Sequence, residues 1–505
     1  MREHVVRFQV HLRSKKATNN SRRRGKIGSA RRRPTSFSLS RSWQYDKLKL
    51  TGQIRAMTRK GLSAIITLLA LVGVQTPMRA YTLEYRDSAG VVAGRWLTKP
   101  IIISLSTSLN SPPPNIKPGS DVIGAVRNAL EHWAKGTDVQ FLETSSTVQT
   151  ISPHNAGDRI NLITVSAENS AAFRASESPG RTRVFYDSGG TIVEADIALN
   201  PNQPFSTDGT PGTYDLESTF THEVGHLLGL EHSAIIGATM QPRQAMNGVY
   251  GLPAFTQRTL SADDVAGVRA LYGSRAGTGS ISGKLIVNGL SGGSRPIFGA
   301  QIFAEDAETG KVLGSTVSLA SGEYHIETLA PGNYHVIVQS LEGPVAASDI
   351  ASTGGQYSSL IESTAFRSFM ANGPSLSQLI SVTSDAPVSL GSFVFTNPAP
   401  ALKPQVIGMN GELSTTVLPL KAGKTFRIYV GGNGIDQIAT AGLSISSSLI
   451  SVVADSLQQE EFDTPYPVIS FEVTVASSVQ PGDYSIRLQS AGGEFTYLAG
   501  AITVE

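Results

Sequence analysis

Apolar and polar positions alternate in several short segments of residues 96–273, which is the pattern expected of strands. Residues 100–105 are instead apolar at nearly every position, as in a strand buried on both faces. Two other segments flank residues 188–190, a Ser-Gly-Gly sequence that predicts a β-hairpin. The predicted strands are 100–105, 158–165, 183–187 and 192–199.

Three further segments of this region have apolar residues at helical spacing. One helix is predicted over 120–135, and a second from about Asp215, which can cap it, to Leu228. The third begins at Ser261, which forms the S-x-x-D pattern of a capping box with Asp264. Strands and helices together predict an α+β domain over residues 81–277.

The character of the chain changes after Gly273, where a Gly/Ser linker opens a region of short alternating strands with no convincing helix. A Pro-rich hinge at 397–404 divides this region in two. The pattern predicts two all-β sandwich domains of about 100 residues each. Their predicted limits are 278–397 and 398–505, and the strands expected in the first are 282–287, 300–304, 323–327 and 334–338.

The strongly apolar run at residues 62–74 is typical of the hydrophobic segment of a secretory signal peptide. It is too short to span a hydrocarbon core of about 30 Å comfortably. Arg59 and Lys60 precede it, and Ala80 offers a small residue for cleavage. We therefore expect a signal peptide over 57–80, a secreted mature chain and no stable membrane span, with an uncleaved anchor as the alternative.

Charge is distributed unevenly along the 505 residues. Residues 1–60 hold 18 Lys and Arg against Glu3 and Asp46, which leaves 24 basic and 38 acidic residues in the rest, a net of −14. An acidic body is poorly suited to nucleic acid, so no nucleic-acid partner is expected. Residues 1–56 are interpreted as a disordered extension or the product of an upstream start codon; a nucleic-acid-binding arm is the alternative.

The chain contains no cysteine, and this excludes disulfide-stapled scaffolds, thiol nucleophiles and cysteine zinc clusters. With 50 glycines and only 16% charged residues, it is typical of a protein rich in turns and strands.

Residues 222–232 form the pattern H-E-x-x-H-x-x-G-x-x-H, which contains the candidate metal ligands of the chain. Four residues apart on a helix, His222 and His226 face the same way and can bind one Zn²⁺. Gly229 permits a positive φ, so the chain can turn back and bring His232 as the third ligand. Three protein ligands leave the fourth position open, as in a catalytic zinc site.

Glu223 lies one position after the first histidine, where its carboxylate can reach a zinc-bound water without binding the metal. The motif therefore predicts hydrolysis through that water with Glu223 as general base. The alternative is that these are ordinary surface histidines. Five fixed identities within eleven residues argue against chance.

These residues resemble the metzincin zinc metallopeptidases and, more narrowly, the matrixin type. Ser233 follows the third histidine, Met240 lies in an A-T-M-Q-P turn, and 260–273 is similar to the closing helix of that domain. The resemblance implies that Met240, in the Met-turn, forms an apolar floor under the metal. It also implies that the strand in the 190s hairpin pairs with an extended substrate.

A calcium ion near Asp187 and Asp196 is left open, although two carboxylates in a hairpin are usually just solvated. Residues 278–340 resemble a carboxypeptidase regulatory-like, transthyretin-type β-sandwich, and the last domain is similar to immunoglobulin-like domains. Such modules serve in cell-surface or matrix contact, spacing or substrate docking.

The sequence thus predicts a secreted zinc endopeptidase with protein or peptide substrates. One alternative is an adhesin with a degenerate peptidase domain that binds through its β-sandwiches. Another is a hydrolase of a non-protein amide. Because no catalytic group was found beyond the linker, residues 81–277 are expected to suffice for proteolysis.

Overall fold

The computed structural model describes residues 8–9, 94–153, 157–173, 178–273, 275–288, 293–350, 357, 359–360, 365–371, 378–396 and 399–505. They belong to one unit of the chain. The predicted signal peptide at 57–80 and mature start at Tyr81 lie outside the described residues, as does the extension at 1–56 apart from 8–9.

A six-stranded sheet with the order β1-β5-β6-β4-β2-β3 forms the first half of the fold. Neighbouring strands are parallel, except that β5 and β6 form the antiparallel hairpin expected from the Ser-Gly-Gly turn. The strands are β1 (Phe8–Gln9), β2 (Ile101–Ser106), β3 (Phe141–Ser146), β4 (Leu162–Thr164), β5 (Gly180–Tyr186) and β6 (Ile192–Leu199).

Two predictions about these strands are wrong. The strand expected at 158–165 is only Leu162–Thr164, because Arg159 adopts a φ of +66°, which interrupts an extended backbone. The strand of the 190s, β6, is paired by β4 on one side and β5 on the other, so no substrate strand can join it. The outermost strand on this side is β1, which pairs with β5 only at Phe185 and Tyr186, so no other described strand covers the rest of β5 there.

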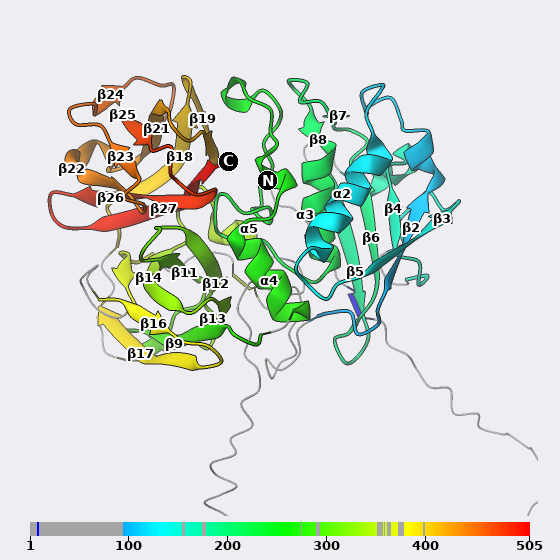
Figure 1. The fold of residues 1–505 in the computed structure, drawn as a ribbon, viewed down its shortest axis with the longest axis horizontal. Helices are drawn as coiled ribbons and strands as arrows, with labels where there is room; N and C mark the ends of the chain where they lie inside the picture. The colour runs from blue at the N-terminus through cyan, green and yellow to red at the C-terminus, as the bar shows by residue number, and fades with distance from the viewer. Residues whose placement is uncertain are drawn as a thin grey trace, which may run out of the picture. The chain divides into compact units, whose positions relative to one another are not determined.

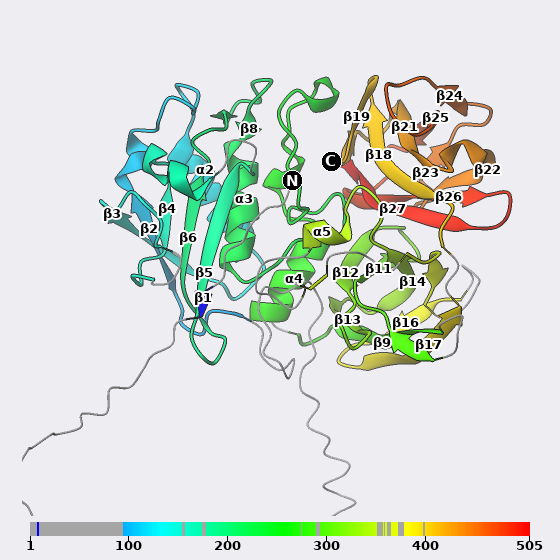
Figure 2. The ribbon, with the colours of Figure 1, turned by 180° about the vertical axis from the view of Figure 1, so that it is seen from behind.

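Two helices, α2 (Val122–Ala134) and α3 (Leu216–Leu227), lie on the same face of this sheet, as the opposite views of Figure 1 and Figure 2 show. Trp133 of α2 is fully buried, and its indole Nε1 donates to the carbonyl of Thr221 on α3. The closing helix α4 (Ala262–Tyr272) has the predicted capping box between Ser261 and Asp264. Two-residue strands β7 (Phe205–Ser206) and β8 (Tyr214–Asp215) lead into α3.

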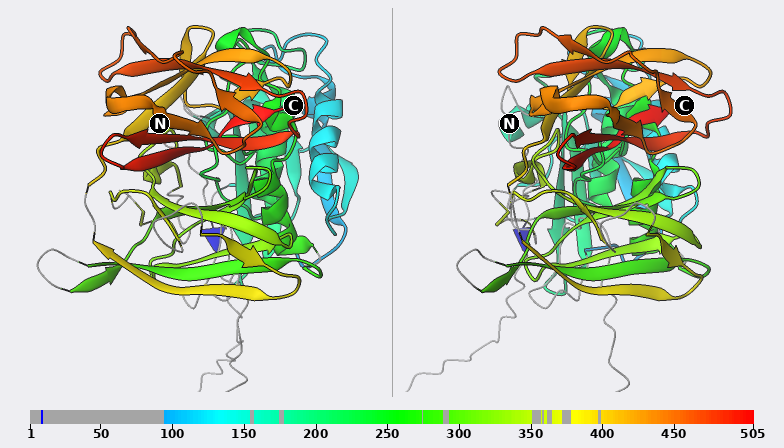
Figure 3. Two further views of the ribbon diagram at one scale, coloured as in Figure 1. Left: turned by 60° about the vertical axis from the view of Figure 1, so that its left-hand side comes forward. Right: turned by 90° about the vertical axis from the view of Figure 1, so that its left-hand side faces the viewer.

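Four sheets follow α4, in two sandwiches whose strands run side by side in Figure 3. The first sandwich contains β9 (Gly279–Asn288), β10 (Ser294–Pro296), β11 (Ala300–Asp306), β12 (Val312–Val317), β13 (Glu323–Leu329), β14 (Gly332–Ser340), β15 (Phe369–Met370), β16 (Ile380–Val382) and β17 (Pro387–Thr396). The second contains β18 (Lys403–Met409), β19 (Glu412–Ser414), β20 (Leu418–Leu420), β21 (Thr425–Asn433), β22 (Ile438–Ile445), β23 (Ile450–Val452), β24 (Gln458–Glu460), β25 (Val468–Val475), β26 (Gly482–Ser490) and β27 (Phe495–Val504).

The first sandwich also contains a short helix, α5 (Ala347–Ile350), in a region where the pattern of apolar residues indicates no helix. Four residues make a single turn, which is too short for an apolar periodicity to appear. The fold class itself is confirmed: an α+β domain is followed by a region made almost entirely of strands.

Candidate metal centre

Helix α3 carries the first two histidines and is held firmly at its beginning. Asp215 accepts a hydrogen bond of 2.9 Å from the backbone N–H of Ser218, as an N-cap does, and forms an ion pair with Arg258 at 2.6 Å. The face of the helix away from the histidines is fully buried, through Leu216, Phe220, Val224 and Leu227. A helix fixed by its cap and its apolar face holds the histidines in a defined orientation.

The chain reverses after α3 at Gly229, which has the positive φ expected of it, +94°. A Cβ there would lie 2.3 Å from the carbonyl oxygen of Gly94, so only glycine fits. The N–H of Leu230 closes the turn by donating to the Gly225 carbonyl at 3.0 Å. This turn directs the following segment, and His232 with it, back beside the helix.

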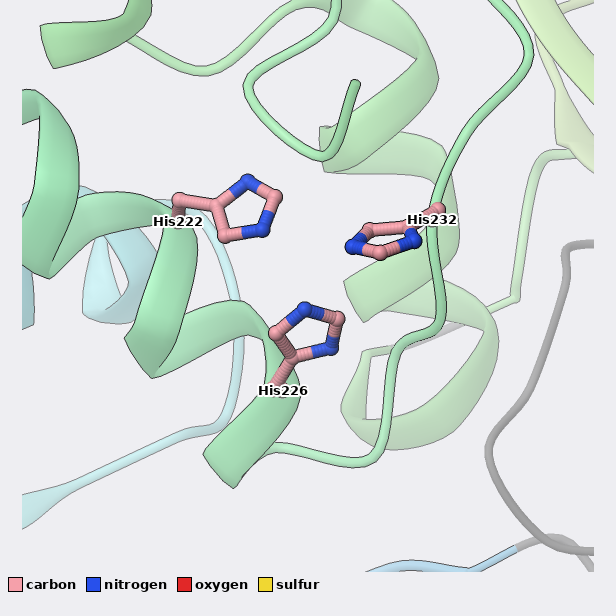
Figure 4. A group of neighbouring side chains, drawn as sticks. All are labelled: His222, His226 and His232. Atoms are coloured by element: carbon pink, nitrogen blue, oxygen red, sulfur yellow. The ribbon is translucent and has the colours of Figure 1, made fainter. Parts of the chain in front are cut away.

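The three histidines converge, as Figure 4 shows. One ring nitrogen from each of His222, His226 and His232 lies within 4.8 Å of the other two. Among the described residues, this is the group of metal-ligand side chains close enough to hold one ion. His226 and His232 are almost completely buried.

Each imidazole is oriented by a backbone carbonyl. The Nδ1 atoms of His222, His226 and His232 lie 2.8 Å from the carbonyl oxygens of Thr239, Leu230 and Asp349, respectively. A carbonyl oxygen can only accept, so each Nδ1 carries a proton, and in a neutral imidazole of this tautomer Nε2 is the nitrogen that binds a metal. Three convergent neutral imidazoles are the donor set of a catalytic zinc site.

The carboxylate of Glu223 lies on the sheet side of α3. Thr182 of β5 donates to its Oε2 at 2.5 Å, and a Cβ at Gly180 would lie 2.5 Å from its Oε1. Glu223 is 5% exposed, so the contact with β5 leaves little room for other orientations.

Met240 packs beneath the helix that carries the histidines. A Cβ at Gly225 would lie 2.2 Å from the Met240 sulfur, so the absence of a side chain at 225 makes this packing possible. The carboxylate of Asp264 on α4 accepts from the backbone N–H groups of Thr239 and Met240 at 2.7 and 3.1 Å. Burial raises the pKa of Asp264. The sequence indicated Asp264 only as a capping residue, yet it also anchors the Met-turn.

Neither acidic residue considered for calcium belongs to a metal-binding group among the described residues. Asp187 accepts from Gly189 and Thr191 within its turn. Asp196 accepts from the backbone N–H groups of Ser152 and Leu162 at 2.7 and 3.0 Å, and burial raises its pKa to about 7. Backbone donors thus occupy both carboxylates.

The sequence did not indicate Thr182 or Asp349 as parts of the site. Thr182 has no motif around it, and its approach to Glu223 depends on how β5 packs against α3. Asp349 comes 117 residues after His232. No local pattern links residues so far apart.

Residues 95–273 match the family model described as matrixin. Matrix metalloproteinase-19 of Homo sapiens is 28% identical over 232 residues, which cover 46% of this chain and 38% of that protein. The hatching enzyme of Paracentrotus lividus is 35% identical over 166 residues, which cover 32% of this chain and 24% of that protein. The chain therefore spans well under half the length of these relatives.

The solved structure of GBS52, the minor pilin of Streptococcus agalactiae, aligns with a TM-score of 0.15 and 11% identity over 26% of this chain and 50% of that one. This likeness is too low to support an argument about the fold. In the part of the chain that the structure describes, no helix combines the length and apolar character needed to span a bilayer.

Proposed function

Because residues 95–273 form a matrixin domain, we propose that the chain is a zinc endopeptidase acting on protein or peptide substrates. The observation that carries the proposal is the convergence of one ring nitrogen from each of three histidines, with each imidazole held at Nδ1 by a backbone carbonyl. In this proposal His222, His226 and His232 are the zinc ligands, and Met240 forms the floor of the site.

Lewis acidity is the chemistry that zinc supplies in such a site, polarising the scissile carbonyl and acidifying the attacking water. Glu223 serves as the general base: it accepts the proton of the water and delivers it to the leaving amine. Thr182 supports this role by holding Oε2 of the carboxylate with its hydroxyl. The backbone carbonyls on the Nδ1 atoms keep the three imidazoles in the tautomer that binds metal.

An extended substrate fits best beside the part of β5 that β1 leaves uncovered, next to α3. The pattern at 57–80 supports secretion of the enzyme. We further propose domain limits of 81–277, 278–397 and 398–505. The grouping of the strands from β2 onward into sheets supports these limits, whereas β1 (Phe8–Gln9) joins the first sheet from outside them. The two sandwiches are suited to contact with a cell surface or matrix.

A zymogram on gelatin or casein tests the activity. The full chain should clear the substrate, a zinc chelator should abolish clearing, and added Zn²⁺ should restore it. Clearing that survives chelation would contradict a zinc mechanism. A chain that binds one equivalent of zinc but cleaves neither protein would favour the alternatives, a binding protein or a hydrolase of a non-protein amide.

A further inference from the structure

The third histidine differs from the other two in where its Nδ1 partner comes from. His222 and His226 donate to Thr239 and Leu230, both inside the matrixin domain. His232 donates to the carbonyl of Asp349, which belongs to α5 of the first β-sandwich. One of the three contacts that orient the metal ligands is therefore made by a residue outside the matrixin domain.

The α5 turn is fixed to the matrixin domain by the side chain of Asp349. Its carboxylate accepts from the backbone N–H of Ala346 at 2.7 Å and forms an ion pair with Arg243 at 2.9 Å. Arg243 also donates to the carbonyl of Pro344. Because Arg243 follows Met240 by only three residues, Asp349 contacts both the third histidine and the segment after the Met-turn.

The loop after His232 is buried among residues of both sandwiches. Ile235 and Ala238 are fully buried and pack in a cluster with side chains of the two sandwiches, among them Phe303 and Tyr497. The backbone carbonyl of Ala234 accepts from Gln301 Nε2 at 3.0 Å. The backbone N–H of Ile236 donates to the Ala499 carbonyl, also at 3.0 Å. The loop that delivers the third ligand therefore takes its support from residues beyond 278.

We infer that Asp349 is a positioning residue of the metal centre: it anchors the α5 turn so that its own carbonyl orients His232 for metal binding. This inference rests on the proposed zinc function. It makes the first sandwich part of the metal site and replaces the expectation that residues 81–277 suffice for proteolysis. The fixed tautomer and ring orientation of His232 depend on a contact that those residues do not contain.

Zinc affinity tests the inference, because partners that orient metal ligands typically change affinity by about 10–100-fold. The dissociation constant is measured on full-length chains by competition with a chromogenic zinc chelator. Asp349→Ala and Arg243→Ala should each raise it by about 10-fold or more. Asp349→Asn keeps an oxygen that can accept from Ala346 and Arg243, so it should stay within a few-fold of the parent.

Arg427→Ala is the matched control. It removes an ion pair of the same length, 2.9 Å to Glu472, in the second sandwich away from the site. Its zinc affinity should equal that of the parent. Thermal unfolding of each metal-free variant identifies any variant that has lost its fold, and Arg243→Ala decides the question if Asp349→Ala does not fold.

Replacing zinc by Co²⁺ gives a second measurement, which does not depend on the overall stability of the protein. The visible absorption of bound Co²⁺ depends on the geometry of its ligands, so it should change in Asp349→Ala and be restored in Asp349→Asn. If folded Asp349→Ala and Arg243→Ala keep the zinc affinity and the cobalt spectrum of the parent, the inference is wrong. The proposed zinc function would still stand in that case. Equal weakening in Arg427→Ala would overturn the inference as well. A parent chain that binds no zinc would overturn the proposed function and the inference together.

Discussion

Thr182 on β5 donates a hydrogen bond of 2.5 Å to Oε2 of Glu223 on α3. Gly180, two residues earlier and on the same face of the strand, leaves room for the other carboxylate oxygen. Strand β5 therefore determines how the proposed general base points, and a change in β5 should alter catalysis without touching a metal ligand.

Replacing Thr182 by Val removes the hydroxyl and keeps the side-chain shape. A hydrogen bond to a charged group is worth about 1.5–3 kcal/mol, so kcat/KM should fall about 10–100-fold while zinc content stays near that of the parent. Thr182→Ser keeps the donor and should retain most of the activity. Equal losses in the two variants would show that the hydroxyl does not act on Glu223.

Glu223→Gln keeps the volume and the polarity of the side chain but removes the proton acceptor. Because all three histidines remain, zinc should still bind near one equivalent, while the rate should fall by about 10²–10⁴. His226→Ala should instead lose zinc, since it removes a ligand. Zinc content and peptidase rate measured on both variants separate the two roles. A zinc-free Glu223→Gln variant would contradict the role assigned to Glu223.

Gly229→Ala should destabilise the site more than an ordinary glycine replacement. Position 229 combines a positive φ with a Cβ that would lie 2.3 Å from the Gly94 carbonyl. Gly119→Ala is the control, because its φ is +87° but nothing lies within 4 Å of the added Cβ. The left-handed conformation alone costs roughly 1–2 kcal/mol. The free energy of unfolding should fall further in Gly229→Ala, and zinc affinity should fall only there.

The stability of the chain should decrease as the pH rises from about 4 to above 7. Burial raises the pKa of the Asp483 carboxyl to about 7, and Asp264 and Asp263 nearby raise it further, against Thr503 and Lys311, which lower it. A carboxyl with a raised pKa binds its proton more tightly in the folded state. Its contribution to the free energy of unfolding is therefore complete below the pKa that the group has in the unfolded state. The contribution is lost as the pH rises through the pKa of the folded state.

Thermal unfolding at pH 5 and pH 8 measures this loss. Asp483→Asn cannot titrate, so its unfolding temperature should fall less between the two pH values than that of the parent. Some decrease should remain, because burial also raises the pKa of Glu305 to about 7. An identical decrease in parent and variant would show that Asp483 does not carry the effect.

The parts of the site that could be predicted are those fixed by short-range geometry. The spacing of His222 and His226, the glycine turn at 229 and the cap at Asp215 are each determined within a few residues of chain. Physical rules about helix faces, φ angles and capping therefore apply to them directly.

The remaining parts depend on packing between distant segments. The orientation of Glu223 requires the placement of Thr182 on β5 beside α3, which no local pattern encodes. The expectation that β6 pairs with substrate was wrong because β6 lies between β4 and β5, and strand order in a sheet cannot be deduced from alternation alone. Asp349 was missed because α5 is one turn long and lies in a region of strands.

The separation of His232 and Asp349 along the chain has a consequence for biosynthesis. A ribosome adds roughly 5–20 residues per second, and N-terminal domains generally fold first. Asp349 lies 76 residues beyond the end of the matrixin domain at residue 273, which corresponds to a delay of about 4–15 s at that speed. During this interval the matrixin domain can be complete while the contact that orients its third histidine is absent. The order of synthesis alone would then keep a nascent peptidase from reaching full metal affinity before the first sandwich has folded.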